Sequence, residues 1–320
     1  MNSHRWVTTC ALLLAMLCCG AASFAQAPDA RQATASAYLA RGNDWLAKHE
    51  VEKALADFDL AVASAPDFAD AYLTRALARM MKGDLENARH DFDRATQLDP
   101  NNATAYLNRG YLKTRQNDLA GAINDSSQAI RLNPRLAQAW LNRGTIYDQL
   151  GRFAEALADL NQAVKLAPNR ADVYDHRGAV KLKLGDYNGA IADFDQSLKR
   201  APEVAIVWGD RGAARFQLGD LDGALRDYDQ ALRLDPQLAT AWFNRGSLWQ
   251  ARNDWKRAID DFSRCLQSDP QCVDAYAQRG LCWLRLGNEA EAQADFAACL
   301  KLNPKLRADL EQKIRMLQRQ

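Results

Sequence analysis

Proline recurs every 34 residues through most of this chain, and that period constrains the fold more than any other feature. The recurring prolines are Pro66, Pro100, Pro134, Pro168, Pro202, Pro236, Pro270 and Pro304. A fixed period without insertions is typical of repeat architectures, in which each unit buries its apolar face against its neighbours. We therefore predict tandem repeats over residues 35–306, although a chain of 320 residues would otherwise suggest about two globular domains.

Each repeat has the apolar pattern of two helices joined by a short turn. In the seventh repeat, Trp242, Gly246 and Trp249 follow helical spacing in the first half, as do Phe262 and Leu266 in the second half. The turn is usually Gly or Asn followed by Asp, as in Gly83-Asp84, Asn117-Asp118, Gly185-Asp186, Gly219-Asp220 and Asn253-Asp254. The first residue can take the left-handed conformation that ends a helix, and the Asp can cap the next helix. The proline then disfavours helix in the residue before it.

Small and aromatic residues keep fixed positions in the repeat. Alanine holds the twentieth position throughout: Ala54, Ala88, Ala122, Ala156, Ala190, Ala224, Ala258 and Ala292. Glycine holds the eighth position, with Ala76 in the second repeat: Gly42, Gly110, Gly144, Gly178, Gly212, Gly246 and Gly280. An aromatic residue holds the fourth position: Tyr38, Tyr72, Tyr106, Trp140, Tyr174, Trp208, Trp242 and Tyr276. We expect close helix crossings with these rings packed around them. Core packing explains why every repeat has such a ring better than a surface on which carbohydrates or bases stack.

With these positions the chain resembles the tetratricopeptide-repeat family. The [WY]-x-x-R-G spacing, the constant alanine, the aromatic residue four positions after it and the late proline match the family and recur in phase, with Ala76, Ser126 and Leu160 as departures. The resemblance implies an all-α, right-handed superhelical solenoid of antiparallel helix pairs. It also implies a concave groove that binds peptides or protein segments and is not catalytic. We expect the segment 307–320 to be a capping helix, because Leu306, Leu310, Ile314 and Leu317 form an apolar stripe.

Two charged positions are constant and therefore suggest a scaffold contact rather than a ligand surface. Arginine holds the seventh position: Arg41, Arg75, Arg109, Arg143, Arg177, Arg211, Arg245 and Arg279. Aspartate holds the twenty-third: Asp57, Asp91, Asp125, Asp159, Asp193, Asp227, Asp261 and Asp295. A ligand surface usually varies between repeats, since its target is not periodic. We predict that each Arg pairs with an Asp on an adjacent helix in a partly buried bidentate bridge.

Some repeats depart from this pattern. Ser126 stands in the third repeat where the others have Phe, Tyr or Leu. Arg79, Lys113, Lys181 and Arg215 stand at the eleventh position, where other repeats have Trp or Tyr. We expect their alkyl stems to cover apolar surface while their charges reach water.

The resemblance places positions 2, 5, 6, 9, 12 and 13 of each repeat on the concave wall. Residues vary there, as a recognition surface requires, and Asn can both donate to and accept from a peptide backbone. Four members, from repeats five and six, make a local acidic patch: Asp172, Asp175, His176 and Asp210. The predicted protein-binding residues are Asn108, Tyr111, Asn142, Asp172, Asp175, His176, Asp210, Phe216, Phe243 and Asn244.

The N-terminal segment has the composition of a secretory signal. A weakly basic start precedes an apolar run, and small residues around Ala25 offer a cleavage site. We expect residues 1–25 to be a signal peptide and residues 26–34 a leader, with export to the periplasm or outside the cell. The alternative is an uncleaved membrane anchor, because Val7–Ala25 carries no charge and is nearly long enough to span a bilayer.

Charge and cysteine usage narrow the function further. The 41 basic and 40 acidic residues nearly cancel, which disfavours a nucleic-acid binder and a polybasic membrane-surface protein. No nucleophile, phosphate loop or metal-ligand pattern emerges, so we expect no enzyme activity, no metal and no cofactor. Cys265 and Cys299 take an alanine position and resemble slightly large alanines. Cys265–Cys272 is the only short-range pair suited to a disulfide.

These observations favour an exported scaffold that binds a protein or peptide segment in assembling an envelope or secreted complex. The alternative is an accessory subunit that binds an envelope polysaccharide or its precursor. The predicted surface has three Asn at one position and no Trp, which favours a peptide. The sequence does not distinguish a monomer from a homo-oligomer.

Overall fold

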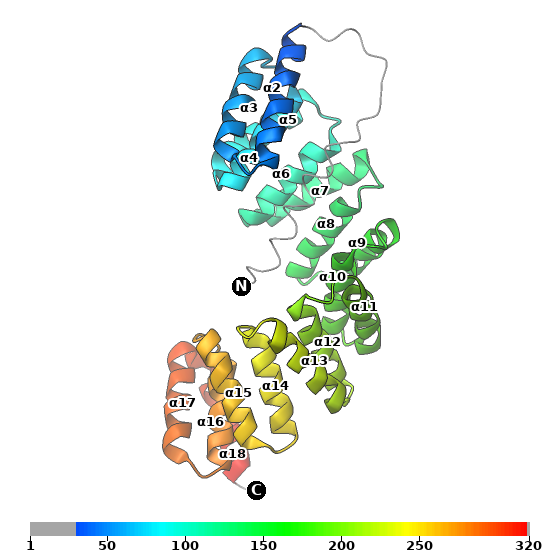
Figure 1. Cartoon of the computed structure of the whole chain (residues 1–320). Helices are drawn as coiled ribbons and strands as arrows, with labels where there is room; N and C mark the ends of the chain where they lie inside the picture. The colour runs from blue at the N-terminus through cyan, green and yellow to red at the C-terminus, as the bar shows by residue number, and fades with distance from the viewer. Residues whose placement is uncertain (1–29, 319–320) are drawn as a thin grey trace. The chain divides into compact units, whose positions relative to one another are not determined.

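The computed structural model describes residues 30–318, and every regular element in that range is a helix. Paired helices match the eight predicted repeats, and within each unit Figure 1 shows the members of a pair lying side by side. The pairs are α2 (Ala30–Ala47) and α3 (Val51–Ser64), α4 (Ala69–Lys82) and α5 (Leu85–Leu98), α6 (Ala103–Arg115) and α7 (Leu119–Leu132), α8 (Ala137–Gln149) and α9 (Phe153–Leu166), α10 (Ala171–Lys183) and α11 (Tyr187–Arg200), α12 (Ala205–Gln217) and α13 (Leu221–Leu234), α14 (Ala239–Ala251) and α15 (Trp255–Ser268), and α16 (Val273–Arg285) and α17 (Glu289–Leu302).

The chain forms two compact units, divided within α6 between Leu112 and Lys113. In the first unit α3 packs against both α2 and α4, so its core continues from one repeat to the next. In the second unit each helix from α8 to α17 likewise packs against the next along the chain. Such continuous packing is expected of a repeat protein, in which neighbouring repeats share one core.

The first helix starts earlier than predicted, and the signal segment is outside the described residues. Residues 30–34 were assigned to the leader but form the exposed first turns of α2, which begins at Ala30. The predicted signal peptide, residues 1–25, and the rest of the leader lie outside the described range. No helix between Ala30 and Gln318 is long and apolar enough to cross a membrane.

The turns within repeats have the predicted chemistry. Gly83 and Asn117 have φ of 86° and 62°, the left-handed conformation that ends the first helix. The following Asp118 caps α7, since its side chain accepts a hydrogen bond of 2.9 Å from the backbone N–H of Gly121. Capping Asp residues also precede α5, α11, α13 and α15.

Glycine at the eighth position allows the two helices of a repeat to cross closely. A Cβ atom added to Gly246 would lie 2.8 Å from Cε1 of Phe262, whose side chain is fully buried. Such a contact is shorter than a real Cβ makes, so the ring occupies the space that the missing side chain leaves. The ring that fills this crossing comes from the twenty-fourth position of the repeat. The fourth-position rings pack against the same buried clusters, as Tyr38 and Trp140 do.

A terminal helix covers the last repeat. The short 3₁₀ turn Pro304–Leu306 leads into α18 (Arg307–Gln318). Leu310 is buried in a cluster with Leu281 and Phe296, and Ile314 and Leu317 pack against that cluster. The apolar face of the final repeat is thereby removed from water.

Candidate binding surface

The constant Arg and Asp residues form the predicted bidentate bridges. In the seventh repeat, Nε and Nη2 of Arg245 donate to Oδ2 and Oδ1 of Asp261, both at 2.8 Å. Bridges with donor–acceptor distances of 2.6–3.0 Å join seven pairs: Arg41–Asp57, Arg75–Asp91, Arg143–Asp159, Arg177–Asp193, Arg211–Asp227, Arg245–Asp261 and Arg279–Asp295. In the third repeat, Arg109 belongs to the first unit and Asp125 belongs to the second. The prediction is confirmed for these seven repeats.

The same arginines also join one repeat to the one before it. Nη1 of Arg245 donates at 2.6 Å to Asp229, which lies in the second helix of the sixth repeat. Equivalent bonds of 2.6–2.9 Å run from Arg75 to Asp59, Arg109 to Asp93, Arg143 to Ser127, Arg177 to Asn161, Arg211 to Asp195 and Arg279 to Ser263. Each of these guanidinium groups is therefore committed to the framework.

The aromatic residues at the fourth position stack on these arginines. In all eight repeats the guanidinium carbon lies 4.6–5.8 Å from the ring centroid, close enough for a cation–π interaction. The polar end of the ring often reaches back across the loop, as where Nε1 of Trp242 donates at 2.8 Å to the carbonyl of Pro236. Half-buried rings thus brace the loop between repeats, which explains why every repeat has one.

The cations at the eleventh position pair with a carboxylate that the prediction did not include, although 20–24% of each side chain stays exposed. They bind the buried Asp at the twenty-third position, which in three of these four repeats also accepts from the repeat's arginine. The contacts are Arg79–Asp91 at 2.7 Å, Lys113–Asp125 at 2.8 Å, Lys181–Asp193 at 2.8 Å and Arg215–Asp227 at 2.7 Å. A buried carboxylate is costly without charged partners, so a second cation is better placed there than in solvent. The sequence prediction did not include this ion pair because it considered each helix alone.

The pKa of the bridged aspartate differs between the first and the seventh repeat. In the first repeat the hydrogen bond from Arg41 lowers the pKa of Asp57. In the seventh, burial is the largest influence and raises the pKa of Asp261, although Arg245 opposes it. The bridge of the seventh repeat is therefore the more desolvated of the two.

The predicted binding residues fall into several classes. Asn108 and Tyr111 belong to the first unit, where Asn108 is buried and its Oδ1 has no hydrogen-bond partner. The other eight belong to the second unit, where Asp175 is buried and the other seven are half-buried. Phe243 stacks with Phe262 at a centroid distance of 5.6 Å, so it supports the core as well as the surface.

Hydrogen bonds and packing hold several of the others. Oδ1 of Asn142 accepts from Gln138 at 2.6 Å, and Asp172 pairs with Arg170. Phe216 packs against the buried cluster around Tyr228. As a binding set, the ten residues stay a prediction.

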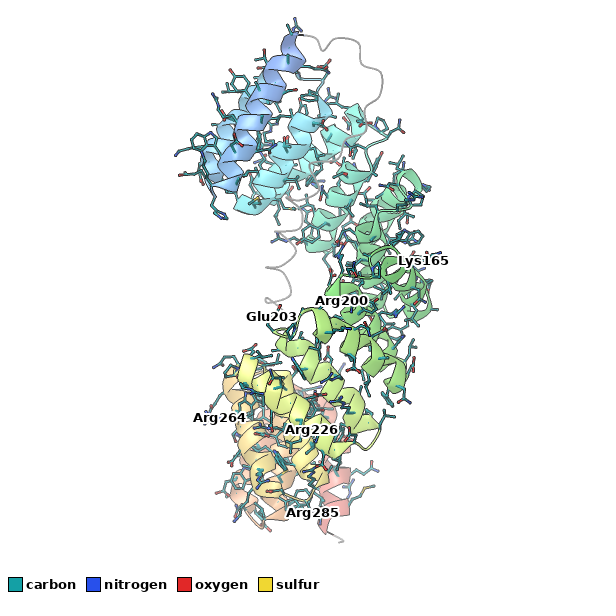
Figure 2. The ribbon with its side chains drawn as sticks, turned by 45° about the vertical axis from the view of Figure 1, so that its right-hand side comes forward. Lys165, Arg200, Glu203, Arg226, Arg264 and Arg285 are labelled. Carbon is teal, nitrogen blue, oxygen red and sulfur yellow. The ribbon has the colours of Figure 1, made fainter. Side chains whose placement is uncertain are left out.

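One pocket does open among positions of the predicted wall. A cavity of about 420 Å³ lies between α14, α16 and α18, close to the start of α15. Its lining residues are Ser247, Gln250, Ala251, Trp255, Leu281, Arg285, Lys313, Met316 and Leu317. Figure 2 labels Arg285 on α16. The guanidinium of Arg285 lies 5.7 Å from the Trp255 ring centroid, and Lys313 pairs with Asp309 at 2.9 Å. This pocket, named here the terminal pocket, is mainly apolar, and its charged lining residues are both cationic.

Sequence reasoning missed the terminal pocket for an identifiable reason. Ser247, Gln250 and Ala251 hold positions 9, 12 and 13 of the seventh repeat, and Leu281 and Arg285 hold positions 9 and 13 of the eighth. These positions were on the predicted wall, but none of the five residues was selected. The other wall comes from α18, which has no counterpart in the repeat pattern. Met316, beside the apolar stripe of that helix and strongly exposed, was the available signal.

Comparisons with known proteins match the repeat pattern. Models described as "Tetratricopeptide repeat" match residues 107–175, 171–204, 239–272 and 273–306. A model described as "TPR repeat" matches residues 76–117 and 212–251. Among curated proteins, no significant match was found.

Solved structures share the fold at low sequence identity. The structure of pilF from Pseudomonas aeruginosa is 21% identical with a TM-score of 0.63, covering 70% of this chain and 100% of its own. The Cut9–Hcn1 structure of the APC/C is 16% identical with a TM-score of 0.65, covering 90% of this chain and 57% of its own. YrrB, a TPR protein with an unusual peptide-binding site, is 23% identical with a TM-score of 0.50, covering 57% of this chain and 95% of its own. With the family models spanning most of the repeats, this chain belongs to the tetratricopeptide-repeat family.

Proposed function

We propose that this protein is an exported, non-enzymatic scaffold that binds an extended segment of another protein. The segment lies along the first helices of the repeats and is anchored in the terminal pocket. The observation that carries this proposal is the pocket itself, because it opens at the variable positions of the seventh and eighth repeats. Concave, mostly apolar sites with a few polar groups are where proteins usually bind ligands.

The framework contacts support a binding role by leaving only the variable positions for recognition. The constant Arg, Asp and aromatic residues bind one another within and between repeats. A partner would therefore be recognised by the residues that differ from one repeat to the next. YrrB, of similar fold, has a peptide-binding site, and Cut9 was solved with Hcn1, so this architecture is compatible with such partners.

The lining of the terminal pocket indicates the chemistry of the anchor. Trp255, Leu281 and Leu317 offer apolar contact, and Met316 can adapt its shape to the occupant. Arg285 and Lys313 contribute positive charge, and none of the lining residues is acidic. We assign to the pocket an apolar side chain that is followed or preceded by an acidic residue.

Export is the part of the proposal that rests on residues 1–25 alone. N-terminal sequencing of the protein recovered from the cell envelope or medium tests it. A start at Gln26 supports signal cleavage after Ala25. A protein that begins at Met1 and sediments with membranes would instead support the anchored alternative.

Site-specific photo-crosslinking in the producing cell tests the binding surface. A benzophenone amino acid replaces Ala251, which is exposed at the pocket, or Arg264, which is exposed on the second helix α15 and labelled in Figure 2. We expect a discrete protein adduct from position 251 and none from position 264. Equal labelling from both positions would contradict the proposal. An adduct whose added mass is removed by glycosidase would favour the polysaccharide alternative.

A matched pair of charge substitutions tests the anchor chemistry. Met316→Glu places a negative charge in the terminal pocket, whereas Gln312→Glu adds the same charge to an exposed α18 position outside the lining. We expect Met316→Glu to weaken the adduct from position 251 at least tenfold, and Gln312→Glu to leave it unchanged. The anchor assignment is wrong if the two variants behave alike while the adduct itself persists.

A further inference from the structure

Two cysteines meet at the junction of the seventh and eighth repeats. Cys265 lies in the last turn of α15 with no solvent exposure, and Cys272 is the partly exposed N-cap residue of α16. Cys272 packs against the apolar cluster that contains Cys265 and Ala275. Both residues are thiols in this structure.

A short turn fixes the position of both cysteines. The backbone N–H of Asp269 donates to the carbonyl of Cys265 at 2.8 Å, and the N–H of Cys272 donates to the carbonyl of Asp269 at 3.1 Å. Asp269 therefore links the backbones of the two cysteines. Because the turn is built from backbone hydrogen bonds, it holds the side chains together whatever their oxidation state.

The two thiols have opposite acidities. The hydrogen bond with Cys265, assisted by the backbone N–H of Ala275 at the start of α16, lowers the pKa of Cys272 to about 7. The same hydrogen bond, followed by burial, raises the pKa of Cys265. Cys272 is thus the more acidic and the more accessible thiol, and Cys265 is the less acidic thiol beside it.

We propose that Cys265 and Cys272 form a dithiol site that low-molecular-weight disulfides oxidise to an intramolecular bond joining the seventh and eighth repeats. The Cys272 thiolate attacks one sulfur of the reagent, forms a mixed disulfide and releases the first reagent thiolate. Cys265 then loses its proton and attacks the sulfur of Cys272, which releases the second reagent thiolate. Two protein thiols are oxidised and one reagent disulfide is reduced to two thiols.

The other cysteines supply internal controls. Cys282 is fully buried, and its burial raises its pKa to about 12. Cys299 is also fully buried, and burial raises its pKa. We expect iodoacetamide to modify Cys272 much faster than Cys282 or Cys299, because Cys272 is partly exposed whereas the other two thiols are fully buried.

Peptide mapping after oxidation tests the proposal. The full chain is treated with glutathione disulfide, trapped with N-ethylmaleimide and digested with trypsin, which places both cysteines in the peptide 265–279. We expect this peptide to lose two hydrogens and to carry neither glutathione nor maleimide. The proposal is overturned if the wild-type peptide keeps glutathione on Cys272, or if both thiols react with maleimide after oxidation.

Three variants separate the steps. Cys265→Ala restores the residue that most repeats have at this position, and we expect it to keep a stable glutathione adduct on Cys272. In Cys272→Ser, Cys265 should remain unmodified because it is buried and protonated. Cys282→Ala should form the bond as the wild type does. A stable adduct on Cys265 in the second variant would contradict the assigned order.

Discussion

The third and seventh repeats share the framework but fill their interiors differently. In the seventh, Phe262 is fully buried against Gly246. In the third, Ser126 holds the same position, is fully buried, and its hydroxyl has no hydrogen-bond partner. Both repeats nevertheless have two helices that begin and end at the same repeat positions. Both repeats also share an Asn-Asp turn whose Asp caps the second helix. The comparison therefore indicates that the turn sets the helix bounds of a repeat, whereas the ring at position 24 mainly adds stability.

Converting the seventh repeat to the third should have the largest effect. Phe262→Ser removes a buried ring, leaves a cavity and adds an unpaired hydroxyl, so we expect a loss of about 5 kcal/mol in the free energy of unfolding. Guanidinium chloride unfolding measures it, and hydrogen exchange of α15 localises it. Leu218→Ser, at a position already largely exposed, should cost less than about 1 kcal/mol. Equal losses from both would show that the ring is not a principal source of stability.

Removing a bridge should come next and should depend on the residue at position 11. Arg245 is the cation paired with buried Asp261, whereas Asp227 has both Arg211 and Arg215. Arg245→Met should cost about 3–5 kcal/mol, because it leaves an uncompensated buried charge. Arg211→Met should cost less, since Arg215 stays on the carboxylate. Chemical unfolding of the two variants compares them directly, and an equal cost would remove the role assigned to Arg215.

The pH dependence of the Arg245→Met variant gives an independent check. Burial already raises the pKa of Asp261, and loss of the arginine should raise it further. A carboxyl whose folded pKa is above its unfolded value destabilises the fold when ionised, and this penalty disappears as the pH falls through the folded pKa. The deficit of Arg245→Met relative to wild type should therefore be smaller at pH 4.5 than at pH 7. A deficit independent of pH would mean that lost packing, not charge, causes it.

Most of the fold could be predicted from the sequence because the relevant contacts are either local or repeated. The Gly83-Asp84 turn acts between adjacent residues, and Arg245 and Asp261 recur at constant spacing in every repeat. Contacts that occur in only some repeats were not predicted. The contact of Lys181 with Asp193 was not predicted, although their spacing of 12 residues recurs at three other pairs and indicates the bridge.

The terminal pocket and the cysteine pair could be predicted less well. The pocket needs α18, whose placement no periodicity describes. Cys265 and Cys272 were recognised as a pair by their spacing, but the opposite acidities depend on the geometry of the α15–α16 turn. These features arise where the repeat pattern ends or varies.

Filling the space at a helix crossing should have a moderate effect that depends on the neighbour. Gly246→Ala should cost about 1–3 kcal/mol, because its Cβ would overlap the ring of Phe262. Gly209 is also buried within a first helix, but an added Cβ would meet nothing nearer than Leu238 at 4.0 Å. Gly209→Ala should therefore stabilise by about 0.5–1 kcal/mol through helix propensity. Thermal unfolding of both variants tests the opposite signs, and stabilisation by Gly246→Ala would disprove the packing argument.

The smallest effects should come from two adjacent serines of the third repeat. Ser126 is buried without a partner, whereas Oγ of its neighbour Ser127 accepts from Nη1 of Arg143 at 2.9 Å. Ser126→Ala removes a desolvated hydroxyl and should be neutral or stabilising by up to about 1 kcal/mol. Ser127→Ala removes an acceptor that links the third and fourth repeats, and should cost about 0.5–1.5 kcal/mol. Urea unfolding of the two variants measures both signs. A larger loss from Ser126→Ala than from Ser127→Ala would mean that the third repeat depends on its buried hydroxyl, and the contrast with the seventh would then lie in polar bonding rather than in a missing ring.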